Sequence, residues 1–168
     1  YDFKDADDGR WAKVIEHAKR GAEHPLQAID FNGKTEDHPV CSAVLSFVGS
    51  GKKGKEIRDH FSNAPYGWPR DAIDGALISL FASGHLRATS NGVGLKPGQV
   101  DQAKVSQTDF RVETTTISTR QRMALRKLYQ QASVDCKPNE ETAAAVPLLN
   151  RLLEFADAAG GEAPLPER

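Results

Sequence analysis

Apolar residues recur at the spacing of one helix face between positions 69 and 84. They are Ile73, Leu77, Leu80 and Phe81. Steps of three or four residues place such positions on one side of an α-helix. Pro69 suits the first turn, where an amide N–H has no helical partner, and Gly84 suits the left-handed position just past the end. The pattern therefore predicts a long helix between these two residues.

A strand and a tight turn follow this helix. Residues 85–89 have the pattern of a strand, and Asn91 with Gly92 is a pair typical of a two-residue β-hairpin. A shorter helix precedes the long one, with Ile57 and Phe61 four residues apart. Short helix, turn, long helix and hairpin, in this order, predict the second half of a winged helix-turn-helix.

The turn between the two helices contains two prolines. Pro65 and Pro69 push the residues before them, Ala64 and Trp68, toward an extended backbone. We therefore expect a stiff turn in which Trp68 anchors the helix pair.

Two further helices are predicted before this unit. The first follows the capping aspartates at 7–8 and runs to about Arg20, and the second begins at Pro39. Their apolar positions are Trp11, Val14, Ile15 and Ala18 in the first, and Val40, Val44, Phe47 and Val48 in the second. Between them we expect a turn or helical piece at 24–32 and a polar loop at 33–37.

The C-terminal part is predicted to hold a strand and two helices. Apolar and polar residues alternate over 110–116, which favours a strand. Ser118 and Gln121 fit the capping box of a helix, and a last helix begins near Asn139 and restarts or kinks at Pro147. The first of these helices is expected to bury Met123, Leu125 or Leu128, and Tyr129. The apolar residues of the last are Leu148, Leu149, Leu152, Leu153, Phe155 and Ala156.

These elements predict a mainly α-helical chain with a small β wing, a winged helix-turn-helix with flanking helices. The predicted domains are an N-terminal helical segment at 1–37, the winged helix-turn-helix at 38–100, and a strand or linker with a C-terminal helical hairpin at 101–168.

Composition is that of a globular chain. Of 168 residues, 39% are hydrophobic and 27% are charged, enough to bury a core beneath a polar surface. We find no signal peptide and no apolar run long enough to span a bilayer, and two cysteines do not suggest a disulfide framework. We expect a reduced, cytoplasmic setting. The chain begins at Tyr1 and its one methionine is Met123, so we expect a piece of a longer protein.

Charge is unevenly distributed along the chain, although the net charge is only −1. Lys and Arg number 6, and Asp and Glu 9, in residues 1–40; the counts are 13 and 7 in 41–130, and 3 and 7 in 131–168. The middle segment is therefore positive, which points weakly to an anionic partner.

Two short motifs are similar to known ligand-binding motifs, but each lacks residues that the binding requires. A phosphate-binding loop needs an early glycine and a hydroxyl residue after its lysine, but Ser46 and Lys53 occupy those positions. His38 and Cys41 form only one pair, whereas zinc sites usually have two. We expect no catalytic residue, no metal site and no cofactor, and we do not expect this chain to be an enzyme.

The long helix occupies the place of a recognition helix, which reads bases with its N-terminal residues. Its outward positions are predicted to be Arg70, Asp71, Asp74, Gly75 and Ile78. Two carboxylates there oppose a polyanion, so Asp71, Asp74 and Ile78 are candidates for binding a protein partner. Candidates for gripping a nucleic-acid backbone are Lys52, Lys53, Lys55, Arg58, Arg70, Arg87 and Lys96. An ordinary solvated surface remains an alternative for these basic residues.

Several segments resemble the large P-loop ATPase subunits of bacterial BREX-type phage-exclusion systems (BrxC/PglY-like). They are residues 54–58, 64–77, 82–88, 118–128, 136–138 and 159–166, and the Ala-Pro-Tyr-Gly-Trp run at 64–68 is the most specific. The resemblance implies phage defence in a multi-subunit system, with ATP hydrolysis elsewhere in the parent protein. The chain lacks the ATP-binding motif, so no catalytic residue of that family transfers to it.

The first hypothesis for the function is therefore a non-catalytic winged-helix module of a BREX-like ATPase that docks a protein partner through the long helix. The partners would be other subunits or domains of the same system, and no membrane is expected. The alternatives are a module that binds double-stranded DNA through its basic rim, and a transcription regulator.

Overall fold

Two units make up the computed structural model, Tyr1–Thr116 and Ile117–Arg168. The structure describes residues 4–114, 119–136, 141 and 144–159. This division differs from the three predicted domains, because segments on both sides of the helix-turn-helix pack into the first unit. Tertiary contacts of this kind leave no mark in the local sequence pattern.

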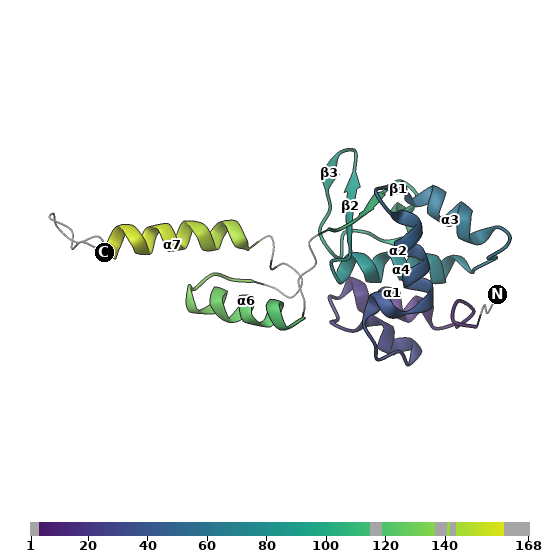
Figure 1. Ribbon diagram of the computed structural model, residues 1–168, viewed down its shortest axis with the longest axis horizontal. Helices are drawn as coiled ribbons and strands as arrows, with labels where there is room; N and C mark the ends of the chain where they lie inside the picture. The colour runs from purple at the N-terminus through teal and green to yellow at the C-terminus, as the bar shows by residue number, and fades with distance from the viewer. Residues whose placement is uncertain (1–3, 115–118, 137–140, 142–143, 160–168) are drawn as a thin grey trace. The chain divides into compact units, whose positions relative to one another are not determined.

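The first unit contains four longer helices and three short helical pieces (Figure 1). The longer helices are α1 (Trp11–Lys19), α2 (Pro39–Val48), α3 (Gly54–Ser62) and α4 (Arg70–Ala82). The short ones are η1 (Pro25–Ile29), η2 (Thr35–Asp37) and α5 (Gln102–Val105). Helices α1 to α4 are present where predicted, and Gly84 has the expected positive φ of 81° after α4. The predicted cap by Asp7 and Asp8 is wrong, because α1 begins after Arg10 and has no side-chain cap. The piece η2 lies where a loop was predicted.

A four-stranded antiparallel sheet completes this unit, in the order β1-β4-β2-β3. Its strands are β1 (Lys52–Lys53), β2 (Leu86–Ser90), β3 (Val93–Gly94) and β4 (Asp109–Val112). Asn91 and Gly92 connect β2 to β3 with φ values of 51° and 78°, as the predicted hairpin requires. Strand β4 lies within the predicted 110–116 segment except for its first residue, Asp109. Residues 115–116 lie outside the described part of the chain.

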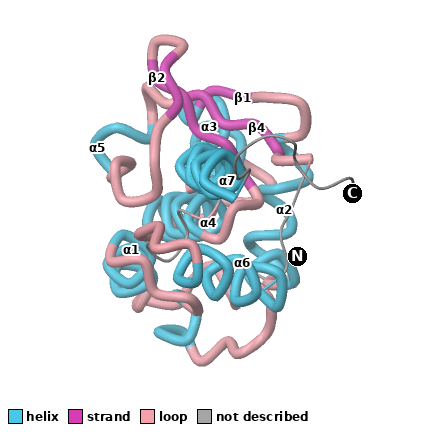
Figure 2. Tube along the Cα trace, turned by 90° about the vertical axis from the view of Figure 1, so that its left-hand side faces the viewer, coloured by secondary structure: helices cyan, strands magenta, loops and turns pink. Residues whose placement is uncertain are grey.

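Helix α4 is the centre of the first unit. Every residue from Ala72 to Ala82 is buried. The sheet lies on one side of α4 and α1 lies on the other, with α2 and α3 beside it (Figures 1 and 2). A helix with apolar residues on all sides is usually buried in a core. Most of the buried residues of α4 are apolar, so its position in the core follows this rule.

Helices α6 (Thr119–Gln131) and α7 (Ala145–Ala159) form the described part of the second unit. Its buried hydrophobic residues among those described are Tyr129, Ala132, Ala144 and Leu148, and Glu141 is buried as well. Met123 and Leu128 are 52% and 43% exposed, so the prediction that α6 buries Met123 is wrong, and of its alternatives Leu125 is the one that packs against this core. The predicted capping residue Ser118 and the predicted start at Asn139 lie outside the described residues.

Pro147 occupies the third position of α7, where the first helical turn tolerates proline. This agrees with the predicted restart of the last helix. No helix in the described ranges is both long and apolar enough to cross a membrane.

Candidate functional site

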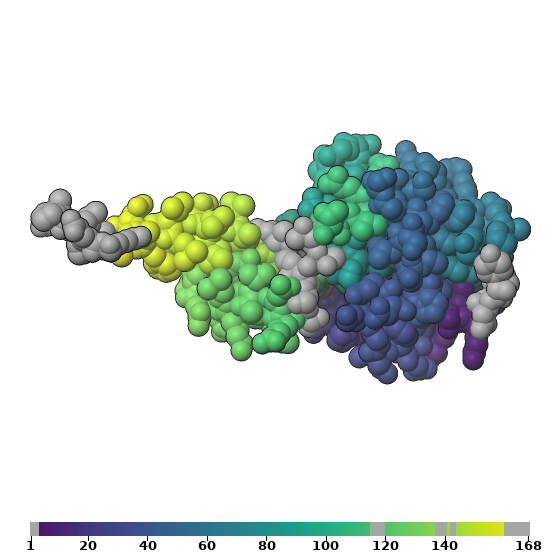
Figure 3. All heavy atoms as spheres, in the orientation of Figure 1, coloured from purple at the N-terminus to yellow at the C-terminus, as the bar shows by residue number. Residues whose placement is uncertain are grey.

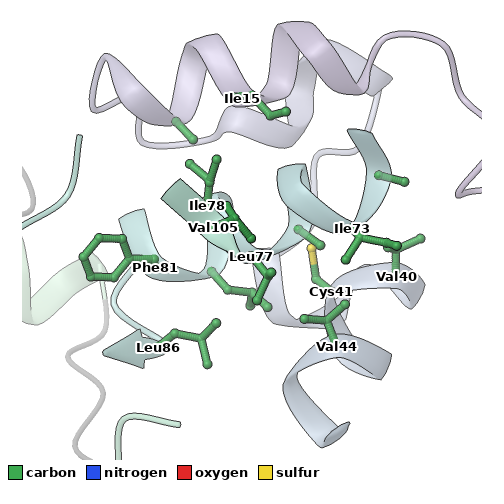
Figure 4. Close-up of a cluster of buried hydrophobic side chains, with 14 of the residues drawn as sticks. Ile15, Val40, Cys41, Val44, Ile73, Leu77, Ile78, Phe81, Leu86 and Val105 are labelled. Carbon is green, nitrogen blue, oxygen red and sulfur yellow. The ribbon is translucent and has the colours of Figure 1, made fainter. Parts of the chain in front are cut away.

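The recognition-helix position, α4, is covered by α1. A Cβ atom added to Gly75 would lie 2.6 Å from Cε3 of Trp11, so the two helices approach as closely as a glycine permits. Ile78 is only 2% exposed and points toward α1, where Ile15 lies (Figure 4). The predicted outward positions of Gly75 and Ile78 are therefore wrong. The reason is that α4 has a second apolar side, which α1 buries.

Asp74 is also buried, in an ion pair with Arg58. The guanidinium donates from Nε to Oδ1 at 2.7 Å and from Nη2 to Oδ2 at 2.8 Å, and both residues are nearly inaccessible, Arg58 at 6% and Asp74 at 0%. Arg58 also donates to Ser106 Oγ at 2.5 Å and to the Gln102 carbonyl at 2.6 Å. Asp74 therefore cannot meet a partner, and Arg58 cannot reach a phosphate. The pair instead joins α3, α4 and the α5 region.

The N-terminal end of α4 keeps two polar residues at the surface. Arg70 has a side chain that is 65% exposed, with Nε 3.8 Å from Oδ2 of Asp74. Asp71 is exposed and accepts a hydrogen bond from Gln102 Nε2 at 2.8 Å. These are the predicted outward residues of α4 that the structure leaves accessible.

The other basic candidates are spread over β1, α3, β2 and the wing. Lys52 is half-buried with its ammonium 5.2 Å from the Phe47 ring centroid. Lys55 pairs with Asp59 at 2.7 Å, a contact that raises the pKa of Lys55. Arg87 pairs with Glu113. Lys53 and Lys96 are exposed, and no ion pair is recorded for either within the described residues.

The solvent-facing side of the sheet brings a further basic residue to this group. Arg111 lies directly opposite Arg87 in the β2–β4 pairing, and Lys53 lies opposite Asp109. Arg111 is not among the predicted basic candidates, although its place between Phe110 and Val112 in an alternating strand was a usable signal. Like charges directly opposite one another destabilise a sheet, and the ion pair of Arg87 with Glu113 offsets part of this repulsion.

The Ala-Pro-Tyr-Gly-Trp run forms an aromatic cluster with α2 and α3. Trp68 stacks on Phe61 with ring centroids 4.6 Å apart and planes 4° apart, and its amide donates to the Phe61 carbonyl at 2.8 Å. Tyr66 packs edge-on against both rings. Trp68 thus contacts α3 as predicted, and the run holds the turn in place.

Cys41 and His38, the two candidate metal ligands of the sequence, are both buried. Cys41 is fully buried, and this burial raises the pKa of its thiol. His38 lies edge-on to the rings of Trp11 and Phe31, and burial lowers its pKa. In the described ranges, no three metal-ligating side chains gather at one place.

Apolar exposure is concentrated in the second unit. Eight large apolar side chains are exposed among the described residues, and seven of them lie on α6 and α7. The seven are Met123, Leu128, Val146, Leu149, Leu152, Leu153 and Phe155, with exposed fractions of 43% to 64%. The eighth is Val93 on the wing, at 67%. The space-filling view shows α7 (yellow) with its side chains at the surface (Figure 3).

Helices α2, α3 and α4, the β2–β3 hairpin wing and the small antiparallel sheet define a winged helix-turn-helix in the first unit, which is not a catalytic fold. Residues 53–121 match the family model described as the BREX ATP-binding protein BrxC winged helix-turn-helix domain. The chain therefore carries a BrxC-type domain, as the sequence resemblance predicted. Neither the curated proteins nor the solved structures contain a match to the chain.

Proposed function

We propose that this chain is a non-catalytic interaction module of a BrxC-type protein, and that it docks other subunits or domains of the same phage-defence system. The observation that carries this proposal is the concentration of exposed apolar side chains on α6 and α7. Apolar patches of this kind mark protein–protein contacts more often than ordinary surface. ATP hydrolysis would belong to another part of the parent protein.

This proposal moves the docking surface away from the recognition helix. Ile78 and Asp74 are buried, so a partner cannot reach them while α1 covers α4. The aromatic cluster and the Arg58–Asp74 pair are contacts within the first unit and hold its elements together. The described part of the first unit exposes one large apolar side chain, Val93. The second unit is therefore the better docking surface.

The test is affinity capture of the system's other subunits by the tagged chain after co-expression. A variant with Leu149→Glu and Leu153→Glu should lose the captured subunits, because both side chains are exposed and would form the contact. Val93→Glu is the matched control, since it places the same charge at an exposed apolar site on the wing. Capture that survives the double substitution would contradict docking through α7.

Binding to the phosphate backbone of double-stranded DNA is the second candidate function. The observation in its favour is the cluster of Lys53, Arg87 and Arg111 on the open face of the sheet. Asp109 lies opposite Lys53 on the same face, and Glu113 pairs with Arg87. These two carboxylates weaken the attraction of the face for a polyanion. Since the recognition helix is buried from Ala72 onward and exposes only Arg70 and Asp71 at its start, such binding would carry little sequence specificity.

Fluorescence anisotropy with labelled duplex DNA at low and moderate salt tests this second candidate. Phosphate contacts release counterions, so binding should weaken steeply as salt rises. Replacing Lys53 and Arg111 by alanine should abolish it, whereas Lys127→Ala on α6 should not. Absence of binding at low salt, where electrostatic attraction is strongest, would exclude the DNA function for this chain.

A further inference from the structure

A cleft of about 450 Å³ lies in the first unit. Its walls are the C-terminal end of α1, the end of β2, the segment that follows the wing, and the short helix α5 (Figure 2). None of its lining residues belongs to the docking surface or to the DNA-binding candidates Lys53, Arg87 and Arg111. The volume falls within the range of small-molecule sites. We refer to this cleft as the α5 cleft.

The walls of the α5 cleft are held in place by hydrogen bonds and close packing. The Asp101 carboxylate caps α5 by accepting from the amide of Lys104 at 3.1 Å. The amide of Leu95 donates to a carbonyl of β2 at 2.8 Å, which fixes the segment after the wing. Gly98 has a φ of 86°, and a Cβ added there would lie 3.3 Å from the carbonyl oxygen of Lys19. The cleft is therefore formed before any ligand enters it.

Two lysines line the α5 cleft, Lys19 from α1 and Lys104 from α5, and both are exposed. No ion pair of Lys19 is found within the described residues. Lys104 Nζ donates to the Gln99 carbonyl at 3.4 Å, which leaves two of its three donors available. Among the described lining residues Asp101 contributes one carboxylate, whose Oδ2 lies 3.7 Å from Lys104 Nζ, too far for a hydrogen bond. The cleft therefore has a net positive charge and favours an anion.

We propose that the α5 cleft binds the phosphate monoester group of a small organic molecule. Such a group carries a charge of about −1.5 to −2 near neutral pH, which the two ammonium groups of Lys19 and Lys104 would balance. Ser90 and Gln107 line the same cleft and offer hydroxyl and amide donors for the remaining phosphate oxygens. Leu95 offers apolar surface to the organic part of the ligand. This site is independent of the proposed docking function.

Titration of the whole isotope-labelled chain with adenosine monophosphate, followed by its amide NMR signals, tests the proposal. We expect saturable shifts of the signals of Lys19, Ser90, Gly98 and Lys104, with a Kd below about 1 mM. Glycerol phosphate should shift the same signals, because it carries the same group, and adenosine should not. Saturable binding of adenosine at these residues would overturn the proposal. So would the absence of saturable shifts with both phosphate esters up to about 10 mM.

Two variants remove the positive charges of the cleft and keep its backbone. Lys19→Ala and Lys104→Ala should each weaken the binding of adenosine monophosphate about tenfold, because each removes a charged donor. Both lysines are exposed, and Lys104→Ala retains the backbone amide from which Asp101 accepts. Lys13→Ala is the matched control, since Lys13 is exposed on α1 and does not line the cleft. Circular dichroism verifies that each variant is folded, and wild-type affinity in a folded double variant would overturn the proposal.

A further pair of substitutions separates the α5 cleft from the open face of the sheet. Lys53→Ala with Arg111→Ala removes the cations proposed for DNA and should leave the binding of adenosine monophosphate unchanged. If this binding is lost, the phosphate occupies the sheet face and the α5 cleft is not the site. The variant with Leu149→Glu and Leu153→Glu should bind adenosine monophosphate as the wild type does, whether or not it captures other subunits. Failure of the docking function is therefore distinguishable from failure of this inference.

Discussion

At the scale of single residues, Arg58 and Asp74 show how burial changes the role of a charged side chain. Each had been predicted at the surface from its own charge and its place on a helix. In the structure, two N–H groups of Arg58 donate to the carboxylate of Asp74, and two more donate to Ser106 Oγ and the Gln102 carbonyl. Such a pair fixes the relative position of α3, α4 and the segment around α5.

Replacing Asp74 by alanine should destabilise the protein strongly. The substitution leaves the Arg58 guanidinium buried without its counter-ion, and removing one partner of a buried pair costs about 3–5 kcal/mol of unfolding free energy. Asp71→Ala is the matched control, because it removes an exposed carboxylate from the same helix and should cost at most about 1 kcal/mol. Urea unfolding measures both. Equal effects would mean that the buried pair adds nothing beyond the helix terminus.

The two cysteines should differ in reactivity toward a thiol reagent such as Ellman's. Cys41 is inaccessible and its burial raises the pKa of the thiol, so little reactive thiolate forms in the folded protein. Cys136 is partly exposed and should react first. A Cys136→Ser variant should therefore show almost no labelling until denaturant is added, and rapid labelling of that variant under native conditions would contradict the buried position.

At the scale of elements, the contact between α1 and α4 depends on a missing side chain. Gly75→Ala should destabilise the protein, because the new methyl group would meet the Trp11 ring at 2.6 Å. Alanine favours a helix over glycine by about 1 kcal/mol, and overpacking costs about 1–3 kcal/mol, so the clash should prevail. Gly9→Ala is the control, since nothing lies within 4 Å of its added Cβ.

Denaturant unfolding of both glycine variants decides this prediction. If Gly75→Ala stabilises the protein, α1 must move to accommodate the methyl group with no loss of unfolding free energy. Gly75→Ala should cost less in a Trp11→Leu background than in the wild type, because the shorter side chain removes the contact, although Trp11→Leu is itself destabilising.

Helices with strong periodicity could be predicted from the sequence, and so could the hairpin. The residues of α1 to α4 carry their own apolar stripes, and Asn91 with Gly92 specifies the turn. Strand β1 could not be predicted, because two lysines have no strand pattern and it exists only by pairing with β4. The same holds for Ile78, since the position of α1 decides whether it is inside or outside.

The candidate site was harder to predict than the fold. Charge and helical position selected Arg58 and Asp74, but a buried ion pair looks the same in sequence as two surface residues. Arg111 was overlooked because its neighbours Arg87 and Lys53 come together only through strand pairing. The exposed side of α7 could not be predicted either, since apolar periodicity does not show what a helix packs against.

At the scale of the whole molecule, the two units should unfold at different denaturant concentrations. The first unit has a large core, whereas the described part of the second has a hydrophobic cluster of four buried side chains. The two tryptophans, Trp11 and Trp68, both belong to the first unit, so their fluorescence reports on that unit alone. Helical circular dichroism reports on both. We expect its transition to begin at lower urea than the fluorescence transition, and coincident curves would contradict two separate units.

The cover that α1 places over α4 also bears on how the protein should be prepared for experiments. A shortened version restricted to the family match at 53–121 would lack α1 and α2. It would open the apolar faces of Ile73, Ile78 and Leu77 to water, and that newly opened area would adhere to many proteins without selectivity. Binding measured with such a truncated version would come from apolar surface that is buried in the whole unit. A version of the winged-helix unit suitable for binding experiments therefore starts before Trp11.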